Sequence, residues 1–337
     1  MGSKKYSVQI NNGERTLSAQ AGGSLLSVLF KNGILVPSAC GGNGRCGFCR
    51  VKITEGAPDF TDSERSIISE ADRLNHVRLS CQIRIFSDIK IELPTSMFKA
   101  KRFTGILEGK SVLTSEIVGL SIRLVNPEEI TFVSGQYIQL RSPMYDGREI
   151  SIRAYSIASL PSDKNHIELN IRFVPNGICS TWVFQHLQVG QKINFTGPYG
   201  DFHLSESNAP AIFIAGGSGM APFHSILRDM VKRDIRRDVT YFFGARTQTD
   251  LFYLDELNRF QRENSWFRFI PALSNEPENS DWKGERGLIT DVVARHFPDC
   301  SKHEAFLCGS PGMIDSCLKV LAQGGMPKDK IYYDKFA

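Results

Sequence analysis

The sequence lacks a long hydrophobic run and has little net charge. Its longest stretch without Asp, Glu, Lys or Arg, residues 207–227, contains three glycines and two prolines around a short apolar segment, so it is a poor membrane span. The first five residues do not lead into the apolar segment that a secretory signal requires. We therefore expect a cytoplasmic protein with no intrinsic membrane span.

A concentrated basic surface is also missing. The formal net charge is only +4, and the basic residues are interleaved with acidic ones along the chain. Nucleic-acid binding, which needs a basic stripe or patch, is therefore not expected. The 337 residues, with 41% hydrophobic and 23% charged, are the ordinary composition of a folded protein of two or three domains.

Four of the eight cysteines form a pattern of their own: Cys40, Cys46, Cys49 and Cys81, with gaps of five, two and 31 residues. A disulfide framework is unusual in a cytosolic chain of this size, and zinc prefers two separated Cys-x2-Cys pairs, of which only one is present. The loop holds four glycines, whose N–H groups can approach thiolate and bridging sulfur. Three ligands in one tight loop with a distant fourth indicate a [2Fe-2S] centre.

The middle of the chain, from about residue 103 to 204, consists of short alternating runs that predict a small antiparallel barrel. Within it, Arg153 offers a forked cationic donor for a pyrophosphate, Tyr155 a flat ring and Ser156 a hydroxyl for a flavin nitrogen. The alternative for Arg153 is a solvated residue at a strand edge. A second group of residues leads into an apolar helix expected over 180–187 and can cap the pyrophosphate with its N–H groups; it comprises Gly177, Ile178, Cys179, Ser180 and Thr181.

From residue 209 onward, strands and helices alternate, which predicts a parallel sheet covered by helices on both faces. The first strand is followed by a loop of small residues that opens the first helix, where a dinucleotide pyrophosphate is expected. This loop does not have the Gly-x-Gly-x-x-Gly spacing, so the argument depends on its position. Its residues are Gly216, Gly217, Ser218, Gly219, Met220, Ala221 and Pro222.

A second loop at the same edge of the sheet begins with Cys308 and Gly309 and is a further candidate for nucleotide contact. Alternatively, Cys308 is simply a buried strand terminus. Arg246, which follows another strand, either pairs with a 2'-phosphate or covers the adenine ring. Asp250 and Asp255 nearby favour an unphosphorylated ribose, so NADH is preferred over NADPH.

These three predicted sites fit one reaction. Hydride transfer moves two electrons at once, a [2Fe-2S] centre accepts one, and a flavin converts between the two. The cofactors perform the difficult chemistry, and the protein orients them. Accordingly, the sequence contains neither Gly-x-Ser-x-Gly nor His-Glu-x-x-His.

The motifs together resemble the ferredoxin-NADP reductase superfamily with an N-terminal [2Fe-2S] ferredoxin domain, and most closely the family of the F subunit of sodium-translocating NADH:quinone reductase. The resemblance implies a β-grasp ferredoxin domain (1–97), an antiparallel β-barrel FAD domain (98–206) and an α/β parallel-sheet NAD domain (207–337), an α+β multidomain protein. It also implies that Arg153 holds the flavin phosphate, that Tyr155 stacks on the flavin and that Ser156 contacts N5. Cys308 would border the nicotinamide, and Phe336 would cap the flavin ring.

We therefore expect an NADH-dependent iron-sulfur flavoprotein reductase whose partner is an external electron-acceptor protein, an oxygenase or another soluble redox protein. Two departures from the F subunit favour a soluble relative: no N-terminal membrane helix, and only a short stretch, residues 143–150, before the flavin motif. The alternative is the electron-input subunit of a membrane NADH:quinone reductase complex. A non-enzymatic electron carrier with degenerate nucleotide sites is the third possibility.

Overall fold

The computed structural model describes residues 4–38, 40–94 and 96–335. The chain forms two compact units, one of Met1–Phe103, Ile138–Ala154 and Asn194–Tyr199, the other of Thr104–Tyr137, Tyr155–Ile193 and Gly200–Ala337. Three sheets, of five, six and six strands, account for the strands of the described chain. The described residues include no helix that is long and apolar enough to cross a lipid bilayer.

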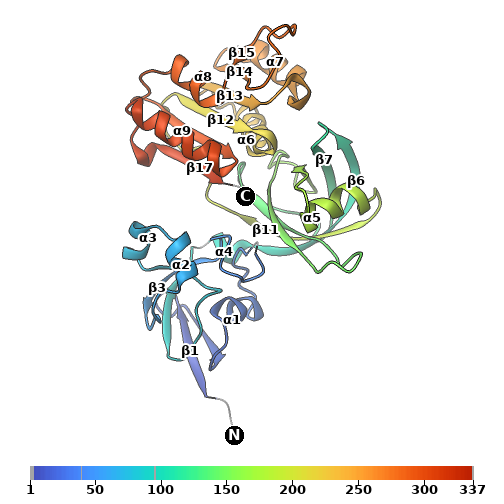
Figure 1. The fold of residues 1–337 in the computed structure, drawn as a ribbon. Helices are drawn as coiled ribbons and strands as arrows, with labels where there is room; N and C mark the ends of the chain where they lie inside the picture. The colour runs from blue at the N-terminus through green and yellow to red at the C-terminus, as the bar shows by residue number, and fades with distance from the viewer. Residues whose placement is uncertain (1–3, 39, 95, 336–337) are drawn as a thin grey trace. The chain divides into compact units, whose positions relative to one another are not determined.

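The five-stranded sheet lies in the N-terminal third (Figure 1). Every second residue of its strands is buried, as Val8 and Ile10 show. Leu25 and Leu29, on the buried face of α1 (Leu25–Lys31), pack against these residues. Ser24 caps α1, and Thr61 forms a capping box with Glu64 at the start of α2. The strands, in spatial order, are β2 (Arg15–Gln20), β1 (Lys5–Ile10), β5 (Ile89–Glu92), β3 (Arg50–Glu55) and β4 (Val77–Leu79), and the helices are α1 (Leu25–Lys31), α2 (Asp62–Ile67), α3 (Glu70–Leu74) and α4 (Ser96–Lys99).

The second sheet is the expected antiparallel near-barrel. In spatial order the sheet begins with β10 (His166–Arg172) and ends with β9 (Ile152–Ser156). An antiparallel bridge joins Ile157, just after β9, to Leu169 of β10 and so brings the sheet close to closure. The helix predicted over 180–187 begins earlier, as α5 (Ile178–Thr181), and continues as a π-helical turn, Trp182–His186. The strands, in spatial order, are β10 (His166–Arg172), β7 (Ile117–Asn126), β6 (Lys101–Val112), β11 (Lys192–Tyr199), β8 (Tyr137–Arg141) and β9 (Ile152–Ser156).

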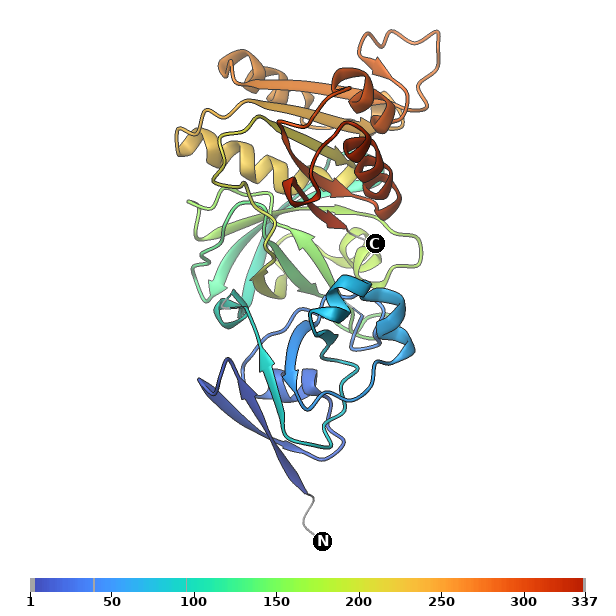
Figure 2. The same cartoon turned by 90° about the vertical axis from the view of Figure 1, so that its left-hand side faces the viewer.

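The third sheet is parallel and has helices on both faces (Figures 1 and 2). Alternate residues of its central strand explain this: Phe213 packs with α6 on one face, whereas Ile212 packs on the other face with residues of α8 and α9. Its strands are β15 (Glu285–Arg286), β14 (Phe267–Leu273), β13 (Val239–Ala245), β12 (Ala211–Gly216), β16 (Glu304–Gly309) and β17 (Ile331–Lys335), and its helices α6 (Met220–Lys232), α7 (Leu254–Glu263), α8 (Ile289–His296) and α9 (Pro311–Gln323).

Candidate functional site

The four expected cluster ligands lie in two pairs. The sulfur atoms of Cys40 and Cys46 are 3.4 Å apart, and the side chains of Cys49 and Cys81 are hydrogen-bonded to each other. In the described part of the chain, no three His, Cys, Asp or Glu side chains gather into a site for a single metal ion. A [2Fe-2S] cluster has two irons and takes four cysteine thiolates, so two pairs of sulfurs fit it better than they fit one ion.

The backbone of the loop favours ionised sulfur. Burial raises the pKa of Cys40, but hydrogen bonds from the backbone N–H groups of Arg45 and Cys46 outweigh this and lower it. The hydrogen bond between Cys49 and Cys81 lowers the pKa of Cys81 to about 6 and raises the pKa of Cys49, so in this pair Cys81 is the sulfur that ionises first. Gly44 has a φ of +67°, a backbone conformation that residues with a side chain rarely adopt, so the loop favours glycine at this position. The donor set therefore fits the expected cluster.

The flavin motif, Arg153 to Ser156, lies in β9. Arg153 is exposed and its Nη1 donates to the Ile152 carbonyl at 2.8 Å, while Tyr155 is half-buried and Ser156 is buried. The exposed, always charged guanidinium of Arg153 is chemically suited to a pyrophosphate. The roles of these three residues stay predictions.

The second flavin segment, Gly177 to Thr181, forms the start of α5. Gly177 is the N-cap, and no side chain caps this end of the helix. The Ser180 hydroxyl donates to the carbonyls of Val174 and Gly177 and accepts from the Val174 N–H, so its side chain closes the loop before the helix. Cys179 is 1% exposed and packs in the interior. From this segment, the backbone N–H groups are therefore the groups best suited to contact a ligand.

The two predicted nucleotide loops meet at the carboxyl edge of the parallel sheet. β12 and β16 are neighbours, with Ala215 opposite Cys308. A Cβ on Gly219 would lie 2.2 Å from the Cys308 carbonyl oxygen, so the loops touch backbone to backbone there. The helix after β12 and the helix after β16 cover opposite faces of the sheet, which makes this the switch point where such sheets bind ligands.

Within the first nucleotide loop, Gly217 to Gly219 form a short 3-10 turn. The sequence predicts a helix that begins at Pro222, and α6 begins two residues earlier, at Met220. Met220, Ala221 and Pro222 are buried in the first turn of α6, where the Met220 sulfur accepts a hydrogen bond from Tyr241 at 2.9 Å. Their side chains pack in the core. Any contact of these residues with the nucleotide would therefore be made by their backbone, and that contact stays a prediction.

The structure brings Ser156 and Cys308 together, since their side chains are hydrogen-bonded. Burial raises the pKa of Cys308 well above its ordinary value, so the residue is a neutral thiol. Asp334 lies opposite Cys308 on β17, and the sequence motifs assigned it no role. The available signal was an acidic residue in an otherwise apolar run, Ile331 to Tyr333. Phe336 lies outside the described residues.

Helix α6 is hydrogen-bonded to the barrel segment. Ser225 donates to the Ser159 carbonyl at 2.6 Å, and Arg228 pairs with Glu168 at 2.9 Å. These bonds hold the start of α6, and with it the first nucleotide loop, at a fixed position relative to residues that follow the flavin motif. Such fixing is what hydride transfer between two bound cofactors requires.

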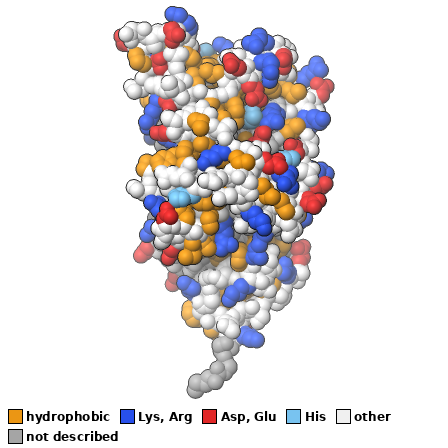
Figure 3. All heavy atoms as spheres, turned by 90° about the vertical axis from the view of Figure 1, so that its right-hand side faces the viewer, with side chains coloured by type: hydrophobic (Ala, Val, Ile, Leu, Met, Phe, Trp, Pro, Cys, Tyr) orange, Lys and Arg blue, Asp and Glu red, His pale blue; other side chains and the backbone are white. Residues whose placement is uncertain are grey.

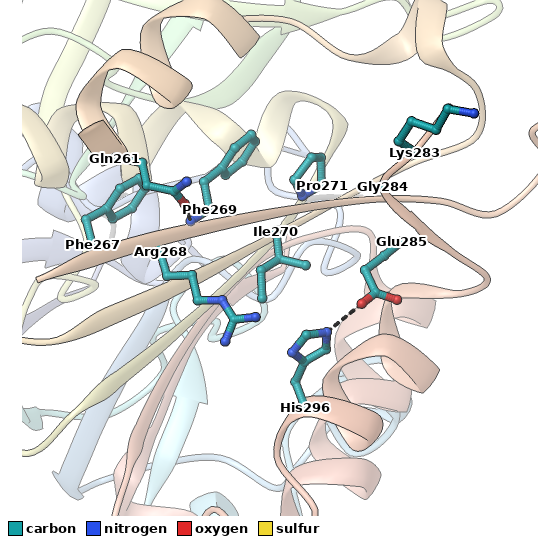
Figure 4. A pocket seen from close by; sticks show the side chains of 10 residues that line it. All are labelled: Gln261, Phe267, Arg268, Phe269, Ile270, Pro271, Lys283, Gly284, Glu285 and His296. Carbon is teal, nitrogen blue, oxygen red and sulfur yellow. Dashed lines mark hydrogen bonds and ion pairs between the residues drawn. The ribbon is translucent and has the colours of Figure 1, made fainter. Parts of the chain in front are cut away.

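A pocket of about 510 Å³ lies elsewhere, beside β14 at the edge of the sheet (Figure 4). None of the predicted site residues lines it. The outward-facing N–H groups of this edge are occupied: Phe267 donates to the Asn264 carbonyl, Phe269 donates to the Gln261 side chain, and Pro271 has no N–H. The edge is therefore closed to an added strand, and the pocket is not part of the candidate site.

Three family models match successive segments of the chain. They describe a 2Fe-2S iron-sulfur cluster binding domain (residues 8–85), an oxidoreductase FAD-binding domain (104–204) and an oxidoreductase NAD-binding domain (213–319). The F subunit of the Na(+)-translocating NADH-quinone reductase of Marinomonas sp. (strain MWYL1) is 32% identical, over 96% of this chain and 90% of that protein. The chain belongs to this F-subunit family. The F subunit of Serratia proteamaculans (strain 568) is likewise 32% identical, over 98% and 91%.

Solved structures resemble this member of the F-subunit family along its whole length. The Amycolatopsis cytochrome P450 reductase GcoB has a TM-score of 0.80 and 28% identity, with 98% of each chain covered. The ferredoxin reductase in carbazole 1,9a-dioxygenase has a TM-score of 0.73 at 24% identity and full coverage of both chains, a likeness of fold.

These matches confirm the predicted family, fold class and cofactors: the chain is an NAD(P)H oxidoreductase that binds a [2Fe-2S] cluster, FAD and a nicotinamide dinucleotide. The domain boundaries after residues 97 and 206 stay predictions.

Proposed function

We propose that this member of the F-subunit family takes electrons from NADH and delivers them, through FAD and the [2Fe-2S] cluster, to a separate one-electron acceptor protein of the oxygenase type. When bound, the flavin exchanges the two electrons of a hydride for single electrons, which the cluster accepts. The observation that carries the proposal is the likeness of the entire chain to a cytochrome P450 reductase, with 98% of both chains covered.

The preference for NADH is supported by acidic side chains after β13. Gln248 in this loop is bonded through its backbone and its side chain to Glu276, and its Nε2 also donates to Asp281 at 3.0 Å. Asp250 accepts from the Thr247 N–H at 2.9 Å. A 2'-phosphate placed beside Arg246 would meet these carboxylates as well, and like charges disfavour it.

Docking of the acceptor is supported by one exposed cation in the cluster loop. Arg45 is exposed, whereas Arg50 is engaged with Asp72 at 2.8 Å and with the Gly47 carbonyl at 3.0 Å. On the face shown in Figure 3, basic and acidic side chains are interspersed, so charge steering toward an acidic partner would be local. Arg45→Glu should slow electron delivery to such a partner, most at low ionic strength.

The test is anaerobic addition of NADH to the holoprotein. We expect bleaching of the flavin absorbance and the appearance of a reduced-cluster EPR signal. Cys46→Ser should keep the flavin bleaching and lose the reduction of one-electron proteins, because the cluster loses a ligand. Absence of flavin bleaching in the wild-type protein would refute the proposal and favour a non-enzymatic carrier.

The second candidate is the electron-input subunit of a membrane NADH:quinone reductase complex, and the identity of 32% with a known F subunit over 96% of the chain favours it. An acceptor screen separates the two. Reduction of an oxygenase component in solution supports the first proposal. Quinone reduction only after addition of membranes carrying the other subunits would support the second.

A further inference from the structure

Gln139 of β8 holds the chain immediately before the cluster loop. Its Oε1 accepts a hydrogen bond from the backbone N–H of Ser38 at 3.2 Å, although the two residues are 101 positions apart. Ser38 lies two residues before Cys40, the first expected cluster ligand. Both partners belong to the same compact unit. The contact therefore joins a strand of the barrel sheet to the start of the cluster loop.

Gln139 is a polar residue in an apolar position. It is 4% exposed, between Ile138 and Leu140, which are both completely buried. Within the described part of the chain its Nε2 has no hydrogen-bond partner, and neither has the Ser38 Oγ. A buried amide with an unpaired donor is unfavourable for folding. An apolar side chain would avoid the unpaired amide donor but would leave the Ser38 N–H without its acceptor, so the bond to Ser38 is what glutamine supplies at this position.

The position of Gln139 along β8 connects it to the flavin motif. β8 and β9 are neighbours in the sheet, and hydrogen bonds mark both ends of their pairing: Ser142 N to Ser151 O at one end and Ile157 N to Gln136 O at the other. Both bonds belong to one register, which sets Gln139 opposite Ala154. Ala154 lies between Arg153 and Tyr155 in the sequence. Gln139 is thus a strand neighbour of the flavin motif, and its side chain is hydrogen-bonded to the residue before the cluster loop.

We propose that Gln139 is a positioning residue that fixes the cluster loop on the flavin-binding strand and thereby sets the rate of electron transfer from FAD to the cluster. This inference rests on the proposed function. Among the described residues, the side-chain hydrogen bond of Gln139 goes to Ser38 and to none of the expected cluster ligands or nucleotide-loop residues. Its loss should therefore change the transfer between cofactors without changing the capture of electrons from NADH.

The experiment compares three variants of the full holoprotein. Gln139→Leu removes the acceptor oxygen, Gln139→Glu keeps an oxygen for the Ser38 N–H, and Ile138→Val alters the same buried strand without touching the contact. The first measurement is hydrogen exchange of a peptide that contains Ser38, which is independent of turnover. The second is anaerobic stopped-flow, which follows flavin reduction and cluster reduction separately, with cluster content determined by EPR.

For Gln139→Leu we expect faster exchange at Ser38 and cluster reduction slowed several-fold, because the loop that carries Cys40 is no longer held on β8 and the distance between flavin and cluster is less well fixed. Flavin reduction by NADH should stay within about twofold of wild type, since a residue outside the nucleotide loops contributes no binding there. Gln139→Glu should restore the protection of Ser38.

Two results would overturn the inference: unchanged cluster reduction in Gln139→Leu, or an equal slowing in Ile138→Val. If Gln139→Leu loses its cluster, the test passes to Gln139→Glu. Normal cluster reduction in Gln139→Glu together with unprotected Ser38 would contradict the positioning role of Gln139. A wild-type protein whose flavin is reduced by NADH but whose cluster is not would refute the proposed function, and the exchange at Ser38 would still report on the contact.

Discussion

Asp334 of β17 lies directly opposite Cys308 of β16, on neighbouring parallel strands. The Oδ2 atom of this carboxyl is buried and has no hydrogen-bond partner among the described residues. Burial, with a further contribution from the charge of Asp201, raises the pKa of Asp334 to about 7. The folded protein therefore favours a neutral carboxyl below that pH, beside the loop expected to border the nicotinamide.

The raised pKa of Asp334 makes the free energy of unfolding depend on pH. Between the unfolded pKa, about 4, and the folded value the native state binds more protons than the unfolded state, so stability falls as the pH rises through this window. Asp334→Asn cannot ionise and should remove this loss. We expect its free energy of unfolding at pH 8 to exceed that of the wild type by about 4 kcal/mol, because each unit of the shift from about 4 to about 7 is worth about 1.4 kcal/mol.

Urea unfolding of both proteins at pH 5 and pH 8 checks this expectation. The difference between variant and wild type should grow by about 2–3 kcal/mol from pH 5 to pH 8. A difference of the same size at both pH values would show that Asp334 does not titrate in this range.

Some parts of this structure were open to prediction from the sequence and others were not. The sequence predicts strands over 239–245 and 267–273 and a helix over 289–296, and these are the bounds of β13, β14 and α8, because each has a regular period of apolar residues. β11 was missed, since Gly197 and Pro198 interrupt its alternation. An acidic residue after the apolar run 331–333 was the local signal for Asp334, but the burial of its Oδ2 atom, like that of Gln139, depends on strands that only the tertiary fold brings together.

The cluster-binding region contains a buried ion pair, Arg78 with Glu64, whose side chains are 3% and 0% exposed. Two guanidinium nitrogens donate to the two carboxylate oxygens, each at 2.9 Å, and Glu64 also accepts from the Leu79 N–H, two residues before Cys81. Arg78→Met leaves an unpaired buried carboxylate, which should lower the free energy of unfolding by about 3–5 kcal/mol. Denaturant unfolding and iron content measure the effect.

The matched control is Lys52→Met. Lys52 pairs with Glu92 at 2.9 Å on β3, but both side chains are nearly half exposed, so the loss should be at most about 1 kcal/mol. Equal effects of the two substitutions would contradict the argument from burial.

Glu64 itself predicts how the protein responds to acid. Burial raises its pKa, but hydrogen bonds from Arg78 and from the backbone N–H groups of Thr61 and Leu79 outweigh burial and hold the pKa below its ordinary value. A lowered folded pKa adds stability above the unfolded pKa, about 4.3, which is lost as the pH falls through the folded value. Glu64→Gln should weaken the fall in stability below about pH 4; an unfolding profile as steep as that of the wild type would contradict this.

Lys110 predicts an effect on flavin retention. Its Nζ donates to the carbonyls of Val183, Phe184 and Leu187 at 2.7, 3.0 and 3.2 Å, at the end of the helix that Gly177 begins. Lys110→Met leaves these carbonyls without their cation. It should lower the free energy of unfolding by about 2 kcal/mol and weaken FAD binding. Fluorescence titration of FAD, with Arg153→Ala as the comparison, is the measurement; FAD affinity equal to wild type would mean that this end of the helix does not influence the other.

The last prediction concerns the contact between the two nucleotide loops. Gly219→Ala would put a Cβ 2.2 Å from the Cys308 carbonyl oxygen, so the loops must separate. Because a misplacement of about 1 Å can cost up to about 100-fold, we expect kcat/KM for NADH to fall by at least about tenfold, with iron and flavin content unchanged. Gly312→Ala, in the first turn of α9, would meet no atom within 4 Å and should retain activity. If both variants keep the wild-type kcat/KM, the Gly219 loop does not bind the dinucleotide; if both lose it equally, the loss reflects a general effect of alanine on these helices and not the contact with Cys308.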